Sequence, residues 1–252
     1  MVDIENYMKR KLLKISYDGT DFNGWQSQKS GRTVQQTIES AISSIAKKKV
    51  SITGAGRTDA GVHALAQYAH FDLDLAMNND QILKAINTQL PRDVRILNVK
   101  DVSPDFHARF DASKRVYRFV ITRQLTPFNR NYRSFLPRFN LYQDRILECL
   151  KIFKGNHDFS SYSKANPDNK TTICTIDEFK LETDSNDLVF TISADRFLHN
   201  MVRRIIGTIV NVTSKKLNNA LLAELLSNKD PANQMIFTAP PQGLYLLDVL
   251  YL

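Results

Sequence analysis

The order of strand-like and helix-like segments in the first hundred residues constrains the fold more than any other feature of the sequence. Period-two strand patterns and period-3.6 helical stripes follow one another at 13–17, 34–45, 50–53, 67–73, 79–90 and 94–102. Thr33 and Gln36 form a capping box before the first helix, and Asn78 or Asn79 can cap the second helix, which Pro91 ends. The order is β-α-β-β-α-β, the ferredoxin-like split unit.

The second half repeats this order of elements without repeating the sequence. Strand and helix patterns occupy 115–122, 132–136, 143–153, 171–182, 188–194, 220–226 and 244–250. A long helix with Phe197 and Met201 on its apolar stripe is expected after residue 194, with Asp195 as its cap. We therefore expect an α/β (α+β) fold of two ferredoxin-like domains, residues 1–103 and 104–252. They would share a continuous, mainly antiparallel sheet with helices on one face.

The charge balance favours a polyanionic partner. The 252 residues include 34 Lys and Arg against 26 Asp and Glu, for a net charge of +8 and a pI near 9.4. Such an excess assists binding to phosphates, although many basic proteins bind no nucleic acid. Charge is therefore a weak argument for RNA when taken alone.

Several classes of protein lack their sequence signals here. No apolar run approaches the roughly 20 residues of a membrane helix, and residues 1–11 have no signal-peptide pattern, so a cytoplasmic location is expected. Cys149 and Cys174 lack metal-ligand spacing, and neither His63 nor His70 has an evident nucleophile partner, which leaves structural or RNA-contacting roles. With no Walker, Rossmann, Gly-x-Ser-x-Gly or zinc motif, we expect neither cofactor nor metal.

One acidic residue stands in a setting typical of a reactive group. Asp59 follows Arg57 by two positions, between Gly56 and Gly61, in the string Ala-Gly-Arg-Thr-Asp-Ala-Gly-Val-His-Ala at 55–64. Both glycines allow unusual backbone angles and remove side-chain bulk, so a substrate can approach closely. The fixed charge of Arg57 can hold a carboxylate, a phosphate or a base. A surface turn is the simpler reading of Asp-Ala-Gly alone.

The whole string resembles the catalytic loop of tRNA pseudouridine synthases of the TruA type. Further motifs of that family are matched in order along nearly the entire chain, at 14–28, 90–94, 106–110, 114–119, 197–203 and 239–244. Each motif is short and weak alone. Their joint order around the decapeptide is what identifies the chain as resembling this family.

The resemblance implies roles for four residues. Asp59 would be the catalytic carboxylate, and Tyr117 the aromatic residue that packs against the target uracil, although a core strand tyrosine is its simpler reading. Arg57 would support flipping of the base, or else contact a phosphate. Arg203 would pair with Asp59, whereas Arg204 lies about 100° away on the helix; a solvated helix face is the alternative for both.

The resemblance also implies the reaction and the partner. A uridine at position 38, 39 or 40 of the tRNA anticodon stem-loop would become pseudouridine, without a cofactor, on a homodimer.

The sequence departs from the family pattern at two positions, and both departures are small. Phe119 stands where the family has tyrosine, and Cys174 stands where it often has a basic residue. The alternative is a catalytically silent RNA-binding protein of doubled ferredoxin-like units. Asp59 favours the enzyme, because a carboxylate facing a polyanion would only repel phosphate.

Overall fold

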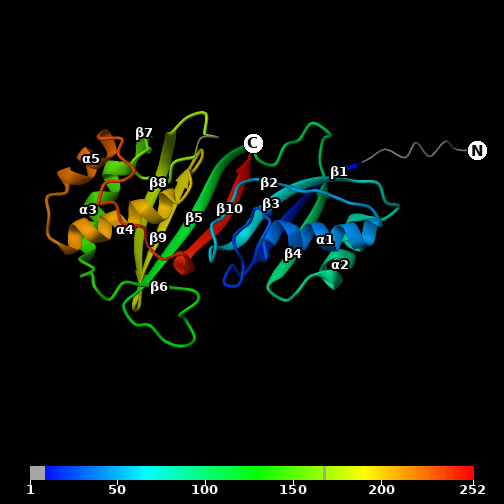
Figure 1. The fold of residues 1–252 in the computed structure, drawn as a ribbon, viewed down its shortest axis with the longest axis horizontal. Coiled ribbons are helices and arrows are strands. Elements are labelled where there is room, and N and C mark those ends of the chain that lie inside the picture. The colour runs from blue at the N-terminus through cyan, green and yellow to red at the C-terminus, as the bar shows by residue number, and fades with distance from the viewer. Residues whose placement is uncertain (1–8, 167–168) are drawn as a thin grey trace, which may run out of the picture. The chain divides into compact units, whose positions relative to one another are not determined.

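The computed structural model describes residues 9–166 and 169–252, which divide into two compact units (Figure 1). The first unit extends to Ser113 and also contains Leu246–Leu252, and the second is Lys114–Tyr245. Residues 1–8, most of the segment without a signal-peptide pattern, lie outside the described residues. The domain boundary expected between residues 103 and 104 stays a prediction.

The first unit contains the predicted β-α-β-β-α-β order. Its elements are β1 (Lys9–Tyr17), α1 (Val34–Ala46), β2 (Thr53–Gly54), β3 (His63–Leu73), α2 (Asn79–Gln89) and β4 (Val94–Asp101). Its strands are ordered β4-β1-β3-β10, where β10 is Leu244–Tyr251, and β2 pairs with β3. β1 is antiparallel to both β3 and β4, with Leu13 opposite Ala69 and Val99.

Local sequence explains where the two helices of this unit begin and how they pack. Thr33 Oγ1 accepts a hydrogen bond from the Gln36 amide at the start of α1. Asn78 and Gln81 form a complete capping box at the start of α2. Val34, Ile38, Ala41 and Ile42 of α1, with Ile82 and Ile86 of α2, are buried. The apolar stripes therefore form the core, as the 3.6-residue period predicts.

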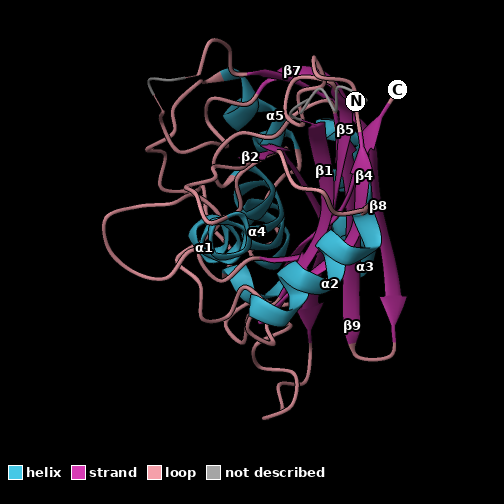
Figure 2. Ribbon diagram, turned by 90° about the vertical axis from the view of Figure 1, so that its right-hand side faces the viewer, coloured by secondary structure: helices cyan, strands magenta, loops and turns pink. Residues whose placement is uncertain are grey.

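The second unit holds the remaining elements, except that the first two residues of β5 belong to the first unit. They are β5 (Ala112–Thr122), β6 (Ser134–Phe135), α3 (Gln143–Leu150), η1 (Lys151–Phe153), β7 (Gly155–Asp158), β8 (Ile173–Asp184), β9 (Asp187–Ala194), α4 (Met201–Ser214), α5 (Ala220–Ser227) and η2 (Pro241–Gly243). Its strands are ordered β5-β9-β8-β7, and β6 lies parallel on the end of β5. Figure 2, which colours helices apart from strands, shows helices packed beside the strands rather than between them.

Three elements differ from the sequence-based expectation. β2 has only two residues, and β7, which was not predicted, pairs with β8. The long helix α4 starts at Met201, so the prediction that Asp195 caps it is wrong. The Asp195 carboxylate instead accepts from the amides of Thr175 and Arg196, at 2.8 and 2.7 Å. These bonds hold a loop, and residues 196–199 do not enter the helix.

The predicted α+β class is confirmed. Helices accompany strands that pair mostly antiparallel, with β5–β6 as the parallel pair among the registers described. In the part of the chain that the structure describes, no helix is both long enough and apolar enough to cross a lipid bilayer.

Candidate active site

The loop that carries Asp59 connects β2 to β3 in the first unit. The Val62 amide donates to the main-chain carbonyl of Asp59 at 3.2 Å, which closes a tight turn. Gly61 in this turn has φ of 75°, a left-handed conformation that favours glycine. Gly56 has no positive φ, so the expectation of an unusual backbone angle there is wrong. A Cβ at Gly56 would meet open space, which leaves the outer side of the loop unobstructed.

Contacts on the buried side of this loop hold it in place. The hydroxyl groups of Tyr17 and Thr58 are 2.8 Å apart, and both residues are buried. The Trp25 amide donates to the Thr58 carbonyl at 3.0 Å. Thr58 therefore points into the protein, whereas Arg57 is exposed and Asp59 is half-buried. The buried Thr58 thus lies between two more accessible residues, Arg57 and Asp59. Its hydrogen bonds therefore fix the main chain on which both charged side chains stand.

The segment that follows β1 is fitted closely against the same loop. Gly24 has φ of 88°, and a Cβ there would lie 2.6 Å from the Thr58 carbonyl oxygen. A Cβ at Gly19 would lie 2.0 Å from the carbonyl oxygen of Val62. The ring of Trp25 is 2% exposed and lies 6.2 Å from that of Tyr17, so this tryptophan is packed inside the protein.

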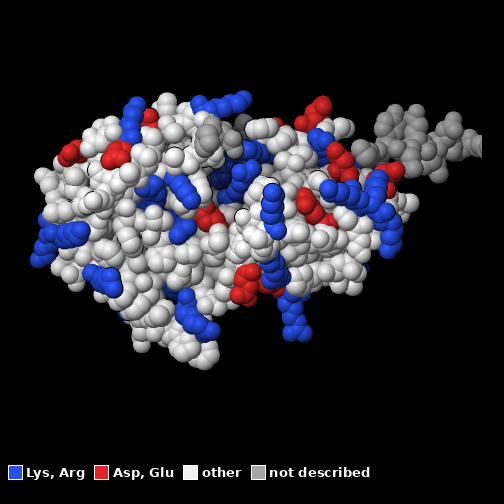
Figure 3. All heavy atoms as spheres, viewed as in Figure 1, with Lys and Arg blue, Asp and Glu red and all other residues white. Residues whose placement is uncertain are grey.

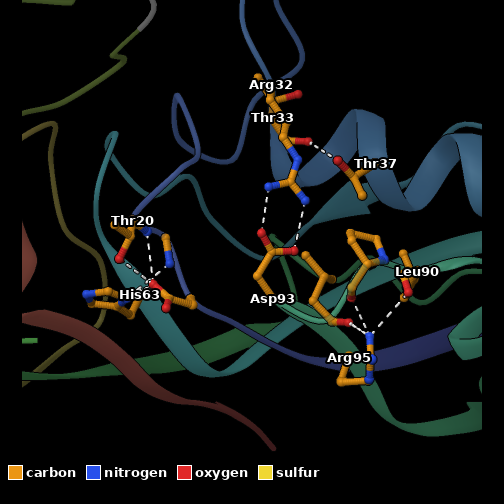
Figure 4. Close-up of polar contacts among 12 residues, drawn as sticks. Thr20, Arg32, Thr33, Thr37, His63, Leu90, Asp93 and Arg95 are labelled. Carbon is orange, nitrogen blue, oxygen red and sulfur yellow. Dashed lines mark hydrogen bonds and ion pairs between the residues drawn. The ribbon is translucent and has the colours of Figure 1, made fainter. Parts of the chain in front are cut away.

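His63 links the end of the loop to the turn after β1. Its Nδ1 accepts from the Gly19 amide at 3.0 Å and lies 3.2 Å from Asp18 Oδ1. The same carboxylate oxygen accepts from the amide and the hydroxyl of Thr20 (Figure 4). His63 is 2% exposed, which supports the structural role over the RNA-contacting role that the sequence left open. His70 also has a structural contact, since its Nδ1 accepts from the Ala108 amide at 3.1 Å.

Arg32, which sequence reasoning missed, joins the start of α1 to the segment before β4. Arg32 forms a bidentate ion pair with Asp93, at 2.6 and 2.8 Å (Figure 4). Its guanidinium lies 4.0 Å from the centre of the Phe22 ring. The contact with Asp93 raises the pKa of Arg32. Arg95 donates to the main-chain carbonyls of Leu90 and Pro91. The motif at 90–94 is therefore joined to Arg32, just before α1, and to Arg95 of β4.

Removing the Tyr17 hydroxyl tests the anchor. Burial raises the pKa of Tyr17 well above its usual value, so this hydroxyl keeps its proton and can donate. Tyr17→Phe leaves the buried Thr58 hydroxyl without this partner, and we expect a loss of about 1–3 kcal/mol in the free energy of unfolding. Denaturant titration measures it.

A double-mutant cycle supplies the control for this prediction. If the two hydroxyls interact, adding Thr58→Ala to Tyr17→Phe costs less than the sum of the single losses. Fully additive losses would contradict the contact.

Tyr117 belongs to the second unit. It lies on β5 opposite Ile192 of β9, and only 8% of its surface is exposed. Its ring meets that of Phe197 edge-on, with centres 5.1 Å apart and planes at 87°. The ring of Tyr117 is therefore fixed by packing, as either a core tyrosine or a stacking platform requires.

The two arginines at the start of α4 have different partners. Arg203 Nε donates to the Ala239 carbonyl at 2.8 Å, and its NH1 donates to Asn200 Oδ1 at 3.0 Å. Arg204 donates instead to the main-chain carbonyls of Ser163 and Pro231. Burial lowers the pKa of Arg204. Arg203 and Arg204 therefore serve different surroundings, as their 100° separation on a helix predicts.

The structure thus places Arg57 and Asp59 on one loop of the first unit, and Tyr117 and Arg203 in the second unit. The resemblance also implies that Asp59, Tyr117 and Arg203 converge in one cleft, and this stays a prediction. Sequence reasoning missed the contacts that hold them, made by Tyr17, Thr58, Asn200 and Ala239. For Asn200 a signal existed, since asparagine before a helix is a common capping residue.

The surface charge, the two cysteines and the search for metal ligands complete the description. Lys and Arg side chains are spread over the face seen in Figure 3, among fewer Asp and Glu side chains. Cys149 and Cys174 are fully buried, and burial raises their pKa values to about 11 and about 12. Within residues 9–166 and 169–252, no cluster of three or more His, Cys, Asp or Glu side chains is arranged to hold a metal ion.

Known proteins resemble this chain along almost its whole length. The family model described as tRNA pseudouridine synthase matches residues 14–111 and 150–252. The tRNA pseudouridine synthase A of Bacteroides thetaiotaomicron is 39% identical over 247 residues, covering 97% of this chain and 91% of that protein. Those of Acetivibrio thermocellus and Lysinibacillus sphaericus are 37% and 39% identical, each covering 97% of this chain and 100% of the relative.

Among solved structures, the archaeal box H/ACA sRNP Nop10–Cbf5 complex matches with a TM-score of 0.35 and 12% identity, over 80% of this chain and 43% of that one. The family match and the curated relatives together cover the Asp59 loop and the segments that back it. The chain therefore belongs to the tRNA pseudouridine synthase family and is an enzyme, an isomerase that acts on tRNA.

Proposed function

We propose that this enzyme converts uridine at position 38, 39 or 40 of the tRNA anticodon stem-loop to pseudouridine, with Asp59 as its catalytic residue. The observation that carries the proposal is the position of the Asp59 side chain on its loop. It is half-buried beside the exposed Arg57, on a loop held by the buried pair of Tyr17 and Thr58. A half-buried carboxylate on an anchored loop, beside an exposed cation, suits chemistry on a polyanion better than simple binding does.

The reaction rearranges bonds within one nucleotide. The bond between N1 and C1′ breaks, uracil turns within the pocket, and a bond forms between C5 and C1′. C5 then loses its proton, while N1 ends with one, so no atom is gained or lost and no cofactor takes part. Asp59 either attacks C1′ or removes a ribose proton to give a glycal.

The other three residues act around this carboxylate in the proposal. Arg57 fills the space that the flipped nucleotide leaves, Tyr117 packs against the detached uracil, and Arg203 pairs with Asp59. Exclusion of water by Tyr117 would protect the intermediate from hydrolysis. The low exposure of Tyr117 and the fixed partners of Arg203 support these roles. A homodimer and a cytoplasmic location belong to the same proposal, by family resemblance.

Release of tritium from tRNA labelled at uracil C5 tests the proposal, because C5 loses its hydrogen only when pseudouridine forms. Anticodon stem-loop transcripts with uridine at 38, 39 or 40, each replaced singly by cytidine, identify the target. We expect release that disappears when the target uridine is replaced. Release that is insensitive to all three replacements would contradict the assigned positions. No release from any tRNA would contradict the proposed reaction as a whole.

Binding to tRNA should depend steeply on salt. The net charge of +8 implies several Lys and Arg contacts to phosphate, and each contact releases counterions. With six or more such contacts, affinity should fall by roughly 10³-fold between 50 and 200 mM salt. Filter binding across this range measures the slope. An affinity that hardly changes would show that phosphate contacts do not dominate.

A further inference from the structure

We propose that the side chain of Asn200 and the main-chain carbonyl of Ala239 position the guanidinium of Arg203 for the reaction. The inference rests on the role proposed above for Arg203 and names what orients it. Asn200 is a positioning residue in this account, because it acts through Arg203.

The contacts approach Arg203 from two sides. Nε donates to the Ala239 carbonyl at 2.8 Å, and NH1 donates to Asn200 Oδ1 at 3.0 Å. The Ala239 amide in turn donates to the Arg203 carbonyl at 3.1 Å, so the two main chains are also joined. A guanidinium is planar, with five N–H groups in fixed directions. Fixing two of these directions fixes the plane, and with it the direction of the N–H groups that remain.

The side chain of Asn200 contacts Arg203 instead of capping a helix amide, which is the usual contact of an asparagine at this position. Asn200 is the N-cap of α4, yet its side chain caps no helix amide. Its φ is 62°, in the left-handed region that glycine and asparagine tolerate best. Glycine would fit this backbone, but it has no acceptor to offer Arg203. An asparagine here combines the left-handed turn with an oxygen directed at the arginine.

The carbonyl on the other side is held equally firmly. Ala239 is fully buried and precedes Pro240, which restricts its backbone to extended conformations. A Cβ at Gly207 of α4 would lie 2.9 Å from the Ala239 nitrogen, so this segment rests directly on the helix. The Pro240 carbonyl accepts from Ser134 Oγ at 2.9 Å. The Ala-Pro-Pro segment is therefore a rigid acceptor, not a loose connection.

Two variants of Asn200 separate the side chain from the backbone turn. Asn200→Gly keeps the left-handed turn and removes the acceptor, and we expect kcat to fall about 10- to 100-fold, the scale of a misplaced catalytic group. KM and the melting temperature should stay close to wild type. Asn200→Asp keeps both the turn and an acceptor oxygen, and should retain kcat within about threefold of wild type. Wild-type kcat in Asn200→Gly, or equal losses in both variants, would overturn the inference.

A measurement on the wild-type protein covers the case in which a variant fails to fold. Proton NMR of arginine Nε–H groups, assigned with Arg203→Lys, should show slower solvent exchange for Arg203 than for the exposed Arg57. Equally fast exchange would overturn the inference. The role of Arg203 itself fails on a different result, wild-type turnover in Arg203→Lys. Thus the two failures can be told apart.

Discussion

Asp59→Asn should lower the rate of pseudouridine formation by at least about 10³-fold, a loss on the scale seen when an enzyme loses its reacting group. Asparagine has nearly the same shape, but its neutral amide can neither attack C1′ nor take a ribose proton. The loop should keep its fold, because the turn is closed through the main-chain carbonyl of residue 59 and anchored through Thr58. Affinity for tRNA should stay the same or rise slightly, since one negative charge is removed.

Tritium release under single-turnover conditions measures the rate, and filter binding measures the affinity. Asp105→Asn is the matched control, because Asp105 is an exposed aspartate of the same unit, outside the loop. It should behave as wild type in both assays. Turnover that survives in Asp59→Asn would remove Asp59 from the reaction. A parallel loss of tRNA affinity would indicate instead that Asp59 serves binding.

Gly19→Ala should destabilise the first unit and inactivate the enzyme together. The added Cβ would lie 2.0 Å from the Val62 carbonyl oxygen, so one of the two main chains must move. Overpacking of this kind costs about 1–3 kcal/mol, or more when main chain is displaced. For a chain of this length, each 1 kcal/mol lowers the melting temperature by about 2–4 °C. Movement of Val62 would also shift the turn that presents Asp59.

Gly56→Ala provides the matched comparison for thermal unfolding. It makes the same substitution within the Asp59 loop itself, at a glycine where a Cβ would meet open space. Its melting temperature should remain within about 1 °C of wild type. Equal melting temperatures for Gly19→Ala and wild type would contradict the close approach of the two segments.

The sequence predicted best those elements whose signals are local. The capping residues Thr33 and Asn78, and Pro91, locate α1 and α2, because the bonds that begin a helix join residues three apart. The start of α4 was misplaced because the Asp195 carboxylate accepts from the amide of Thr175, a contact 20 positions away in sequence, and the helix begins only after Asn200.

β7 was missed for a similar reason. Residues 155–158, Gly-Asn-His-Asp, have no strand pattern, and pairing with β8 from Gly155 to Asp158 makes them a strand. Tertiary context overrides propensity in such short segments.

The residues of the candidate site also fall into those with a local sequence signal and those without one. Asp59 and Arg57 were located by their motif, whereas the bond from Tyr17 to Thr58 joins residues 41 positions apart and has no sequence signal.

Pseudouridine mapping at single-nucleotide resolution tests the central claim most directly. Unmodified tRNA is incubated with the wild-type enzyme or with Asp59→Asn, and every uridine is examined before and after. We predict new pseudouridine at position 38, 39 or 40 with the wild-type enzyme, and none with the variant. Pseudouridine confined to another part of the tRNA, or formed equally well by Asp59→Asn, would contradict the account.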